Sequence, residues 1–173
     1  MTSANAIHVR RRTPADLETC GAILRRVHEL DRYPVEGVTD TDTWLNPPTL
    51  TRAWVATLDH QVVGHALLTS PTEGDAAARL WHEQTDTPLA AITVLGRLFV
   101  DPLARGHAAG SHLLREVLQY ATAHGLTAVL DVMEKDEAAI RLYERAGWRP
   151  IGKARHTFGA NQSVRALCYV API

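Results

Sequence analysis

Hydrophobic and polar positions in the first thirty residues predict a strand followed by a helix. Residues 6–12 alternate in the manner of a weak strand. Thr13, Pro14 and Asp16 then supply a capping hydroxyl, a proline in the first turn and a carboxylate three residues after the cap, which are typical of a helix start. Apolar residues recur after them at helical spacing: Leu17, Cys20, Leu24, Val27 and Leu30. The helix is therefore expected to run to about Leu30.

The next apolar segments predict a β-hairpin. Residues 52–58 and 61–69 both have the pattern of strands, and only two residues separate them. The segment 31–51 before the hairpin contains three prolines, so we expect a loop there, with one short helix at residues 40–45. The hairpin would supply the second and third strands of the chain.

The most apolar run, residues 89–100, predicts a buried strand. Gly96 interrupts this run, and an isolated glycine in a strand suggests a bulge or a close approach of the backbone. The insertion at residues 71–88 is expected to hold a short helix at residues 75–84. After the apolar strand, hydrophobic residues at helical spacing predict a helix that ends at Gly125.

A strand, a helix and two further strands complete the pattern. The strand covers residues 126–132, the helix begins near Asp136 and ends at Gly147, and the last strands cover residues 148–157 and 163–170. Strands and helices in this order fit a mixed sheet with helices on both faces. The expected fold class is therefore α/β (α+β).

Composition and charge exclude several classes of protein. Hydrophobic residues make up 46% and charged residues 21% of the chain, as in soluble globular proteins. Eighteen Lys and Arg against nineteen Asp and Glu leave a net charge of −1, which argues against a nucleic-acid partner. No stretch approaches the roughly 18 apolar residues of a transmembrane helix, and residues 1–12 lack the apolar segment of a signal peptide. We therefore expect a cytoplasmic protein with a single domain over residues 1–173 and no membrane partner.

Cysteine and histidine spacing gives no sign of a metal site. Cys20 and Cys168 lie far apart in the sequence, and we expect both to be reduced thiols in the core. His60 and His65 are five residues apart on either side of the predicted hairpin turn. No HExxH or paired-cysteine motif occurs. A required metal is therefore not expected.

A segment of small residues between the apolar strand and the next helix is a candidate anion site. It reads Arg105, Gly106, His107, Ala108, Ala109, Gly110 and Ser111. Backbone N–H groups at a helix start lack partners within the helix, the helix dipole adds about half a positive charge, and small side chains let an anion approach. Arg105 can add a full charge and a bidentate donor. Many such turns are glycine-rich only because the chain turns, so this segment alone leaves both interpretations open.

A second block of residues that bears on the function follows about 30 residues later. It comprises Leu130, Val132, Asp136, Ala139, Ile140, Leu142, Tyr143, Glu144, Gly147 and Trp148. The two blocks, in this order and context, resemble motifs A and B of the GNAT (GCN5-related N-acetyltransferase) superfamily, and the resemblance covers nearly the whole chain. It implies the GNAT fold: a mixed sheet of six to seven strands whose splayed central strand pair binds the cofactor.

The resemblance implies an N-acetyltransferase that moves an acetyl group from acetyl-CoA to a primary amine. Backbone groups of Leu98, Phe99 and Val100 would pair with the pantetheine arm of the cofactor, and the segment from Arg105 to Ser111 would hold its pyrophosphate. Because no cysteine is placed beside the proposed sulfur site, direct attack in a ternary complex is expected.

Tyr143 aligns with the tyrosine that, in this family, lies near the cofactor sulfur and can protonate the departing thiolate. A phenol with a pKa near 10 stays protonated at neutral pH, which suits that role. The alternative is that Tyr143 only packs on the apolar face of its helix.

Two residues depart from the family pattern. Ala108 occupies a position that is usually glycine, and a left-handed backbone there would cost roughly 1 kcal/mol or more. We expect Ala108 to be helical already, which would make the cost small. Asp136 replaces a common asparagine among the cofactor contacts; it can still cap a helix, but it adds negative charge near a charged cofactor.

The general base and the acceptor site are less well indicated. An alkylamine must lose a proton before attack, and no residue is clearly placed to take it. His82 and Glu83 in the insertion are candidates, but a solvated helix face is the favoured explanation of these two residues, and a water relay ending on backbone carbonyls is another route. Acidic residues in the loop at 31–51 favour a cationic amine: Asp31, Glu36, Asp40 and Asp42. Asp40 and Asp42 are also ordinary helix-capping residues, which is the alternative interpretation of these two.

The candidate acceptor-binding residues are Tyr33, Glu36, Trp81 and Glu83. Tyr33 and Trp81 could instead belong to the core, and Trp44 is expected to be a core residue. A small-molecule amine is preferred as the acceptor because the insertion at 71–88 and the loop at 31–51 could enclose a compact ligand. A protein or peptide N-acetyltransferase, a non-catalytic acyl-CoA-binding module or sensor, and a plain α/β interaction domain remain alternatives. The oligomeric state, a homodimer included, is left open.

Overall fold

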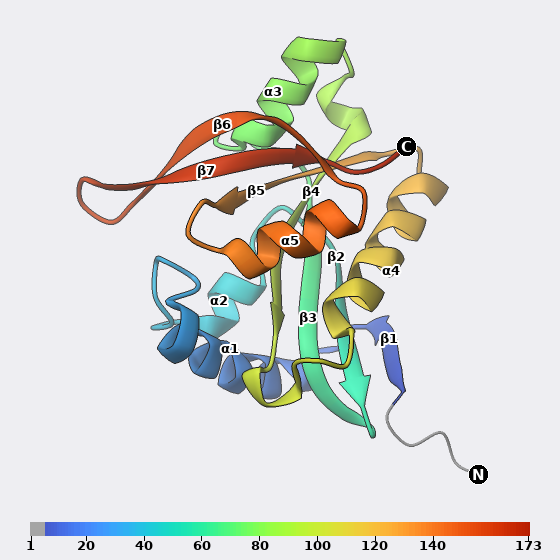
Figure 1. Cartoon of the computed structure of the whole chain (residues 1–173), viewed down its shortest axis with the longest axis vertical. Coiled ribbons are helices and arrows are strands. Elements are labelled where there is room, and N and C mark those ends of the chain that lie inside the picture. Colours follow the sequence, from blue (N-terminus) through green and yellow to red (C-terminus); the bar gives the residue numbers. More distant parts are fainter. Residues whose placement is uncertain (1–5) are drawn as a thin grey trace. The chain divides into compact units, whose positions relative to one another are not determined.

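The computed structural model describes residues 6–173, and seven of its strands form one mixed sheet (Figure 1). The strands are β1 (Ile7–Arg11), β2 (Leu50–Leu58), β3 (Gln61–Thr69), β4 (Ile92–Val100), β5 (Thr127–Met133), β6 (Arg149–Phe158) and β7 (Gln162–Val170). Their order in the sheet is β1-β2-β3-β4-β5-β7-β6. Strands β4 and β5 pair in parallel, whereas β1 with β2, β5 with β7 and β6 with β7 pair antiparallel. The predicted mixed sheet of six to seven strands is confirmed.

Helices lie between the strands, close to the positions that the sequence predicts. The α-helices are α1 (Leu17–Asp31), α2 (Thr41–Leu45), α3 (Ala76–Thr85), α4 (Ala109–Ala123) and α5 (Glu137–Arg145). Short 3-10 turns are η1 (Pro14–Asp16), η2 (Leu89–Ala91) and η3 (Pro102–Ala104). No helix in the described part of the chain is both long and apolar enough to span a membrane.

The chain forms two compact units, and each is assembled from two separate segments. The first combines residues up to Leu67 with Arg97–Val117, and the second combines Leu68–Gly96 with Leu118–Ile173. The expectation of a single acetyltransferase domain stays a prediction, as does the splay of the central strand pair.

In the first unit, turn and cap chemistry fix the elements. Asp59 and His60, between β2 and β3, both have left-handed backbones with φ of 49° and 66°, as a two-residue hairpin turn requires. The Asp16 carboxylate accepts the Thr13 backbone N–H at 2.7 Å, so the predicted cap is present, although the first turn is a 3-10 turn. The core of this unit is an apolar cluster of Cys20, Ile23, Leu24, Val27, Leu45, Val55 and Phe99.

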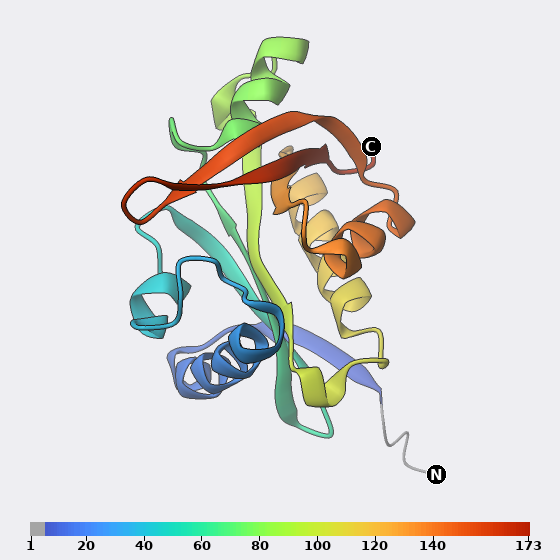
Figure 2. The ribbon, with the colours of Figure 1, turned by 60° about the vertical axis from the view of Figure 1, so that its left-hand side comes forward.

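In the second unit, β6 and β7 run side by side as a long twisted hairpin, which Figures 1 and 2 both show. Helix α3 packs on this unit's strands through Ala77, Ala78 and Trp81, in a cluster with Ile92, Val94, Val129, Cys168 and Val170. The Gln84 side chain donates a hydrogen bond to the Ile151 carbonyl at 2.7 Å, which ties the end of α3 to β6. The insertion that carries α3 is therefore packed against the hairpin strands.

Both cysteines are buried free thiols, as expected. Burial raises the pKa of the Cys20 thiol to about 12 and that of the Cys168 thiol to about 11. Thiols with these pKa values are protonated at neutral pH and are poor nucleophiles. Among residues 6–173, no group of three or more His, Cys, Asp or Glu side chains could hold a metal ion.

Candidate functional site

The segment from Arg105 to Ser111 joins η3 to α4, and its backbone is shaped by two left-handed residues. Gly106 has a φ of 89° and Ala108 a φ of 63°, and α4 begins immediately afterwards at Ala109. The first helical N–H with an acceptor is that of His112, which donates to the Ala108 carbonyl at 3.1 Å. The N–H groups before it belong to the open end of the helix, where the dipole favours an anion. His107 is exposed, and its Nδ1 lies 3.1 Å from the Ala104 carbonyl.

The expectation that Ala108 is helical is wrong. Its φ of 63° places it in the left-handed region, outside α4. A left-handed L-residue costs about 1 to 2 kcal/mol, because its Cβ crowds the following carbonyl oxygen. The loop therefore retains the backbone form that glycine would provide, at an energetic cost.

Replacing Ala108 by glycine should relieve this strain. The gain is offset by the greater freedom of glycine in the unfolded chain, roughly 0.4 to 1 kcal/mol, so the free energy of unfolding should stay level or rise by up to about 1.5 kcal/mol. Ala109→Gly is the matched control: Ala109 is buried and helical, and that change should lower stability by about 0.5 to 1 kcal/mol. Urea denaturation measures both, and equal losses in the two variants would contradict the strain argument.

Two ion pairs connect α1 to this loop and to the start of η3 within the first unit. Arg105 donates to the Asp31 carboxylate at 2.5 Å, and Arg26 donates to Asp101 at 2.7 Å. Burial alone would raise the pKa of Asp101, but hydrogen bonds from Arg26 and from the Leu103 N–H hold it below its ordinary value. Asp101 is thus a buried structural anchor, whereas the Arg105 pair is half-exposed and can exchange partners.

Strand β4, which carries the proposed pantetheine contacts, is distorted in its middle. The sequence places the irregularity at Gly96, but the left-handed residue is the next one, Arg97, with a φ of 51°. Beyond it, Phe99 is buried in the first unit's core, and its neighbours Leu98 and Val100 are half-buried. The Arg97 guanidinium lies 5.0 Å above the Trp44 ring, which stabilises this unusual conformation.

His65 on β3 contacts the distorted strand and helps to hold it, a role that was not predicted from the sequence. Its ring is fully buried, with Nδ1 2.8 Å from the Arg97 carbonyl and Nε2 2.9 Å from Arg12 Nη1. Because Arg12 can only donate, His65 must accept at Nε2 and donate from Nδ1, so the ring is neutral. The ring also stacks on Phe99 at 5.1 Å between centroids. The available signal was a histidine at an inward position of an apolar strand.

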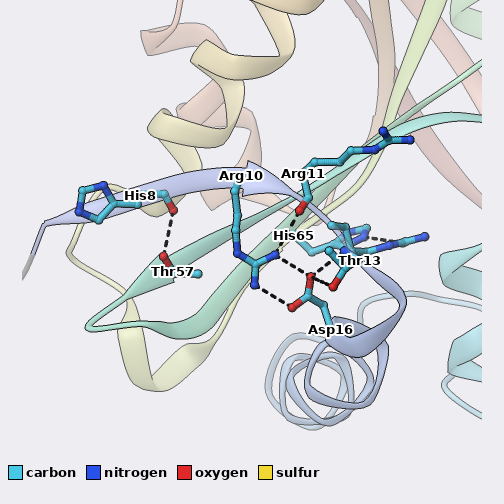
Figure 3. A network of polar contacts seen from close by, with 8 residues as sticks. His8, Arg10, Arg11, Thr13, Asp16, Thr57 and His65 are labelled. Carbon is cyan, nitrogen blue, oxygen red and sulfur yellow. Dashed lines mark hydrogen bonds and ion pairs between the residues drawn. The ribbon is translucent and has the colours of Figure 1, made fainter.

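Arg12 extends this contact network toward α2. Besides His65, its guanidinium donates to the Leu45 carbonyl at 2.7 Å and to the Asn46 side chain. Figure 3 shows Arg10 and Thr13 converging on the Asp16 carboxylate. Both Arg10 contacts are 2.8 Å long. Hydrogen bonding to Arg10, opposed by burial, lowers the pKa of Asp16 to about 2. The start of α1, the end of α2 and the distorted β4 are therefore held by one set of polar contacts.

Tyr143 lies in the second unit, on α5, and its ring is buried against Trp148 with 5.9 Å between centroids. The Trp148 N–H donates to the Tyr143 carbonyl at 3.0 Å, and Gly147 between them is left-handed, so the predicted helix end is confirmed. Burial, with smaller effects of Asp136 and Asp131, raises the pKa of the Tyr143 phenol well above its ordinary value. The phenol therefore keeps its proton at neutral pH.

Asp136 precedes α5 but makes no side-chain cap. Its carboxylate instead pairs with Lys135 Nζ at 2.7 Å. The added negative charge at this position is therefore balanced locally.

The candidate acceptor residues take different positions in the two units. In the first, Tyr33 packs edge-on to Trp44 at 5.9 Å beside the core cluster, and Glu36 is exposed. In the second, Trp81 is buried in the core, whereas Glu83 is exposed on α3. Trp44 is half-buried at the margin of the core.

The acids that favoured a cationic amine are partly occupied by structural contacts. Asp31 pairs with Arg105, and Asp40 accepts the Thr43 N–H at 3.1 Å and its hydroxyl at 2.6 Å as the cap of α2. His82, a candidate base, is exposed, with Nδ1 2.7 Å from the Thr87 carbonyl. These contacts support the structural interpretation of Asp40 and His82.

Comparisons with known proteins agree with this arrangement. Residues 19–148 match the family model described as the acetyltransferase (GNAT) family. The human protein named N-acetylaspartate synthetase is 36% identical over 104 residues, which are 60% of this chain and 29% of that protein. The mouse protein of the same name matches to the same extent. The match thus spans less than a third of the length of these relatives.

Solved structures share the fold at low sequence identity. The ribosomal-protein-alanine N-acetyltransferase from Brucella melitensis has a TM-score of 0.71 at 22% identity, covering 96% of this chain and 99% of that chain. The ribosomal-protein-S18-alanine N-acetyltransferase from Escherichia coli has 0.69 at 18%, covering 96% and 94%. The protein yncA from Salmonella typhimurium, solved with its cofactor acetyl-CoA, has 0.65 at 17%, covering 96% and 93%.

Proposed function

Because this chain belongs to the GNAT acetyltransferase family, we propose that it transfers an acetyl group from acetyl-CoA to a primary amine on a small molecule. The observation that carries the proposal is the loop from Arg105 to Ser111, with its left-handed Gly106 and Ala108 before the open end of α4. Successive N–H groups in such a turn form a concave site for an anion. The residues present therefore suit the diphosphate of the cofactor.

Bound acetyl-CoA would supply the acetyl group as an activated thioester. The N–H groups of Ala109 to Ser111 and the Arg105 guanidinium would hold its diphosphate, and the backbone of Leu98 to Val100 would align the pantetheine arm. Arg105 must exchange its contact with Asp31 for a phosphate oxygen. Because that pair is half-exposed, breaking it costs no more than about 1 kcal/mol.

Tyr143 would act as the general acid. Its buried phenol keeps its proton at neutral pH and can deliver that proton to the departing sulfur. Direct attack by the amine fits the two cysteines, whose thiols are buried and protonated and so are unsuited to a covalent relay. The amine must still lose a proton, and a water relay to backbone carbonyls is our preferred route for it.

A small-molecule acceptor is supported by the sequence relative named for N-acetylaspartate, an acetylated amino acid. The neighbours named for ribosomal proteins share the fold at 18% and 22% identity, which leaves their acceptors open for this chain. We therefore rank a protein N-acetyltransferase, and a non-catalytic acyl-CoA sensor, below a small-molecule enzyme.

Thermal unfolding with acetyl-CoA tests the proposal directly. At about a hundred times the dissociation constant, ligand linkage contributes roughly 2.7 kcal/mol, which for a chain of this size should raise the midpoint by about 5 to 11 °C. Arg105→Gln should reduce this rise, because it removes the charged contact to the diphosphate. Asp31→Asn removes only the competing carboxylate and should preserve or enlarge the rise.

Two outcomes would count against the proposal. No midpoint shift in a folded protein would remove both the enzyme and the sensor interpretations. A shift without release of free thiol in the presence of any amine would leave the sensor interpretation.

A further inference from the structure

A cavity of about 390 Å³ lies on the β6–β7 hairpin in the second unit. Its lining residues are Glu134, Lys153, Ala154, Arg155 and Arg165; we call it the hairpin cavity. Glu134 follows β5 directly, and its N–H donates to the Arg165 carbonyl at 3.0 Å, which fixes the end of β5 against β7. The volume is in the range that holds a small molecule.

The lining has a charge arrangement that opposes folding stability. Arg155 on β6 stands directly opposite Arg165 on β7, and like charges in that position repel across a strand pair. Lys153 is two residues before Arg155, so it lies on the same face of the strand. Within residues 6–173 none of these three cations forms an ion pair; Arg155 only donates to Ser163 Oγ at 3.3 Å. Three unneutralised cations around one hollow suit an anionic ligand.

We propose that the hairpin cavity binds the carboxylate groups of an anionic amine, so that the acceptor is an amino acid or a related carboxylate-bearing amine. This inference rests on the proposed acetyltransferase function. The paired guanidinium groups of Arg155 and Arg165 can hold a carboxylate by bidentate contacts, and Lys153 adds a point charge for a second one. Glu134, the one acid on the lining, suits the ammonium end of the same ligand.

Glu134 also favours this ligand over a second candidate anion, the 3′-phosphate of the cofactor. A dianionic phosphate gains from three cations but is repelled by the carboxylate beside them, whereas a zwitterionic amine uses both signs of charge. Of the four acids that had favoured a cationic amine, Asp40 does not oppose this choice, because it is bound to Thr43 as the cap of α2.

Steady-state kinetics of thiol release with aspartate, glutamate, aspartic acid diamide and putrescine tests the inference. We expect aspartate or glutamate to be preferred over the diamide and over putrescine. Arg165→Gln should raise the KM for the preferred amino acid roughly 10- to 100-fold, the loss expected for one charged hydrogen-bonded contact, with kcat and the KM for acetyl-CoA unchanged. Arg165→Lys should restore part of the affinity. Arg141→Gln removes an exposed arginine on α5 outside the cavity and should change neither KM.

The thermal midpoint of the free protein is a second readout beside the kinetics. Because Arg165 faces Arg155, Arg165→Gln should leave the thermal midpoint of the free protein unchanged or raise it by roughly 1 to 3 °C. A large drop in the midpoint would instead make Arg165 a structural residue and overturn the assignment. Dephospho-acetyl-CoA distinguishes the two sources of negative charge: if Arg165→Gln raises the KM of acetyl-CoA but not that of the dephospho form, the cavity binds the cofactor phosphate and the proposal is wrong.

Calorimetric titration of aspartate and glutamate into the protein with bound CoA separates this inference from the proposed function. Binding that Arg165→Gln abolishes, without turnover of any amine, would support the cavity and contradict the acetyltransferase proposal. Turnover of putrescine or the diamide, with no binding of either amino acid, would overturn the cavity and leave the acetyltransferase standing. If the protein shows no binding of either amino acid and no turnover of any amine, both proposals are wrong.

Discussion

Replacing Tyr143 by phenylalanine should lower kcat by about 10²- to 10⁴-fold, the range that a positioned general acid contributes. The phenol is buried, its pKa is raised well above the ordinary value, and it is therefore protonated whenever the enzyme is at neutral pH. Phenylalanine retains the ring that packs against Trp148, so folding and acetyl-CoA affinity should change little. Thiol release at saturating acetyl-CoA gives kcat, and calorimetry with acetyl-CoA gives the affinity.

Tyr169→Phe is the matched control for this experiment. Tyr169 is also buried in the second unit, and its hydroxyl donates to Glu144 Oε1 at 2.8 Å. Losing that hydrogen bond should cost about 0.5 to 1.5 kcal/mol of stability while kcat is preserved. An unchanged kcat in Tyr143→Phe, or loss of acetyl-CoA binding together with activity, would make Tyr143 a packing residue.

The stability of the protein should fall by about 2 kcal/mol between pH 7 and pH 5, mainly because of His65. Burial lowers the pKa of this histidine to about 3, against about 6.5 in an unfolded chain. The unfolded state therefore binds the proton first, and each pH unit below 6.5 costs about 1.4 kcal/mol until the folded pKa is reached. Urea denaturation at pH 7 and pH 5 measures the difference.

His65→Gln should remove this pH dependence. The variant should be less stable at both pH values, because the Arg97 carbonyl and Arg12 lose the imidazole between them. His8→Gln changes an exposed histidine on β1 and should preserve the difference. The low pKa of Asp16 does not interfere, because its stabilising effect is lost only as the pH falls from about 4 toward 2. A full pH effect in His65→Gln would show that another group causes it.

Local signals along the sequence predicted the fold well. The hairpin turn at Asp59 and His60, the cap at Thr13 and Asp16 and the helix end at Gly147 all depend on residues close together in the chain. Such signals need no knowledge of distant contacts. The motif resemblance, in turn, located the anion loop and Tyr143.

Residues that depend on distant partners were predicted less well. Ala108 is left-handed although alanine prefers a helical backbone, and the distortion of β4 falls on Arg97, whose carbonyl is held by His65 from another strand. The hairpin cavity depends on the register of β6 against β7, which sets Arg155 opposite Arg165. A shift of one residue would place these side chains on opposite faces, and the sequence does not show which register forms.

The division of the chain into two interleaved units bears on how it folds during synthesis. Phe99 belongs to the same buried cluster as Cys20 and Leu45, which precede it by more than fifty residues. That core cannot be completed until the ribosome has added the segment Arg97–Val117, after the whole of Leu68–Gly96 has been made. Contacts of such long sequence separation slow folding and leave apolar surface exposed in the meantime. A nascent chain that ends between β3 and β4 therefore lacks part of the first unit's core and leaves the rest of that apolar cluster uncovered.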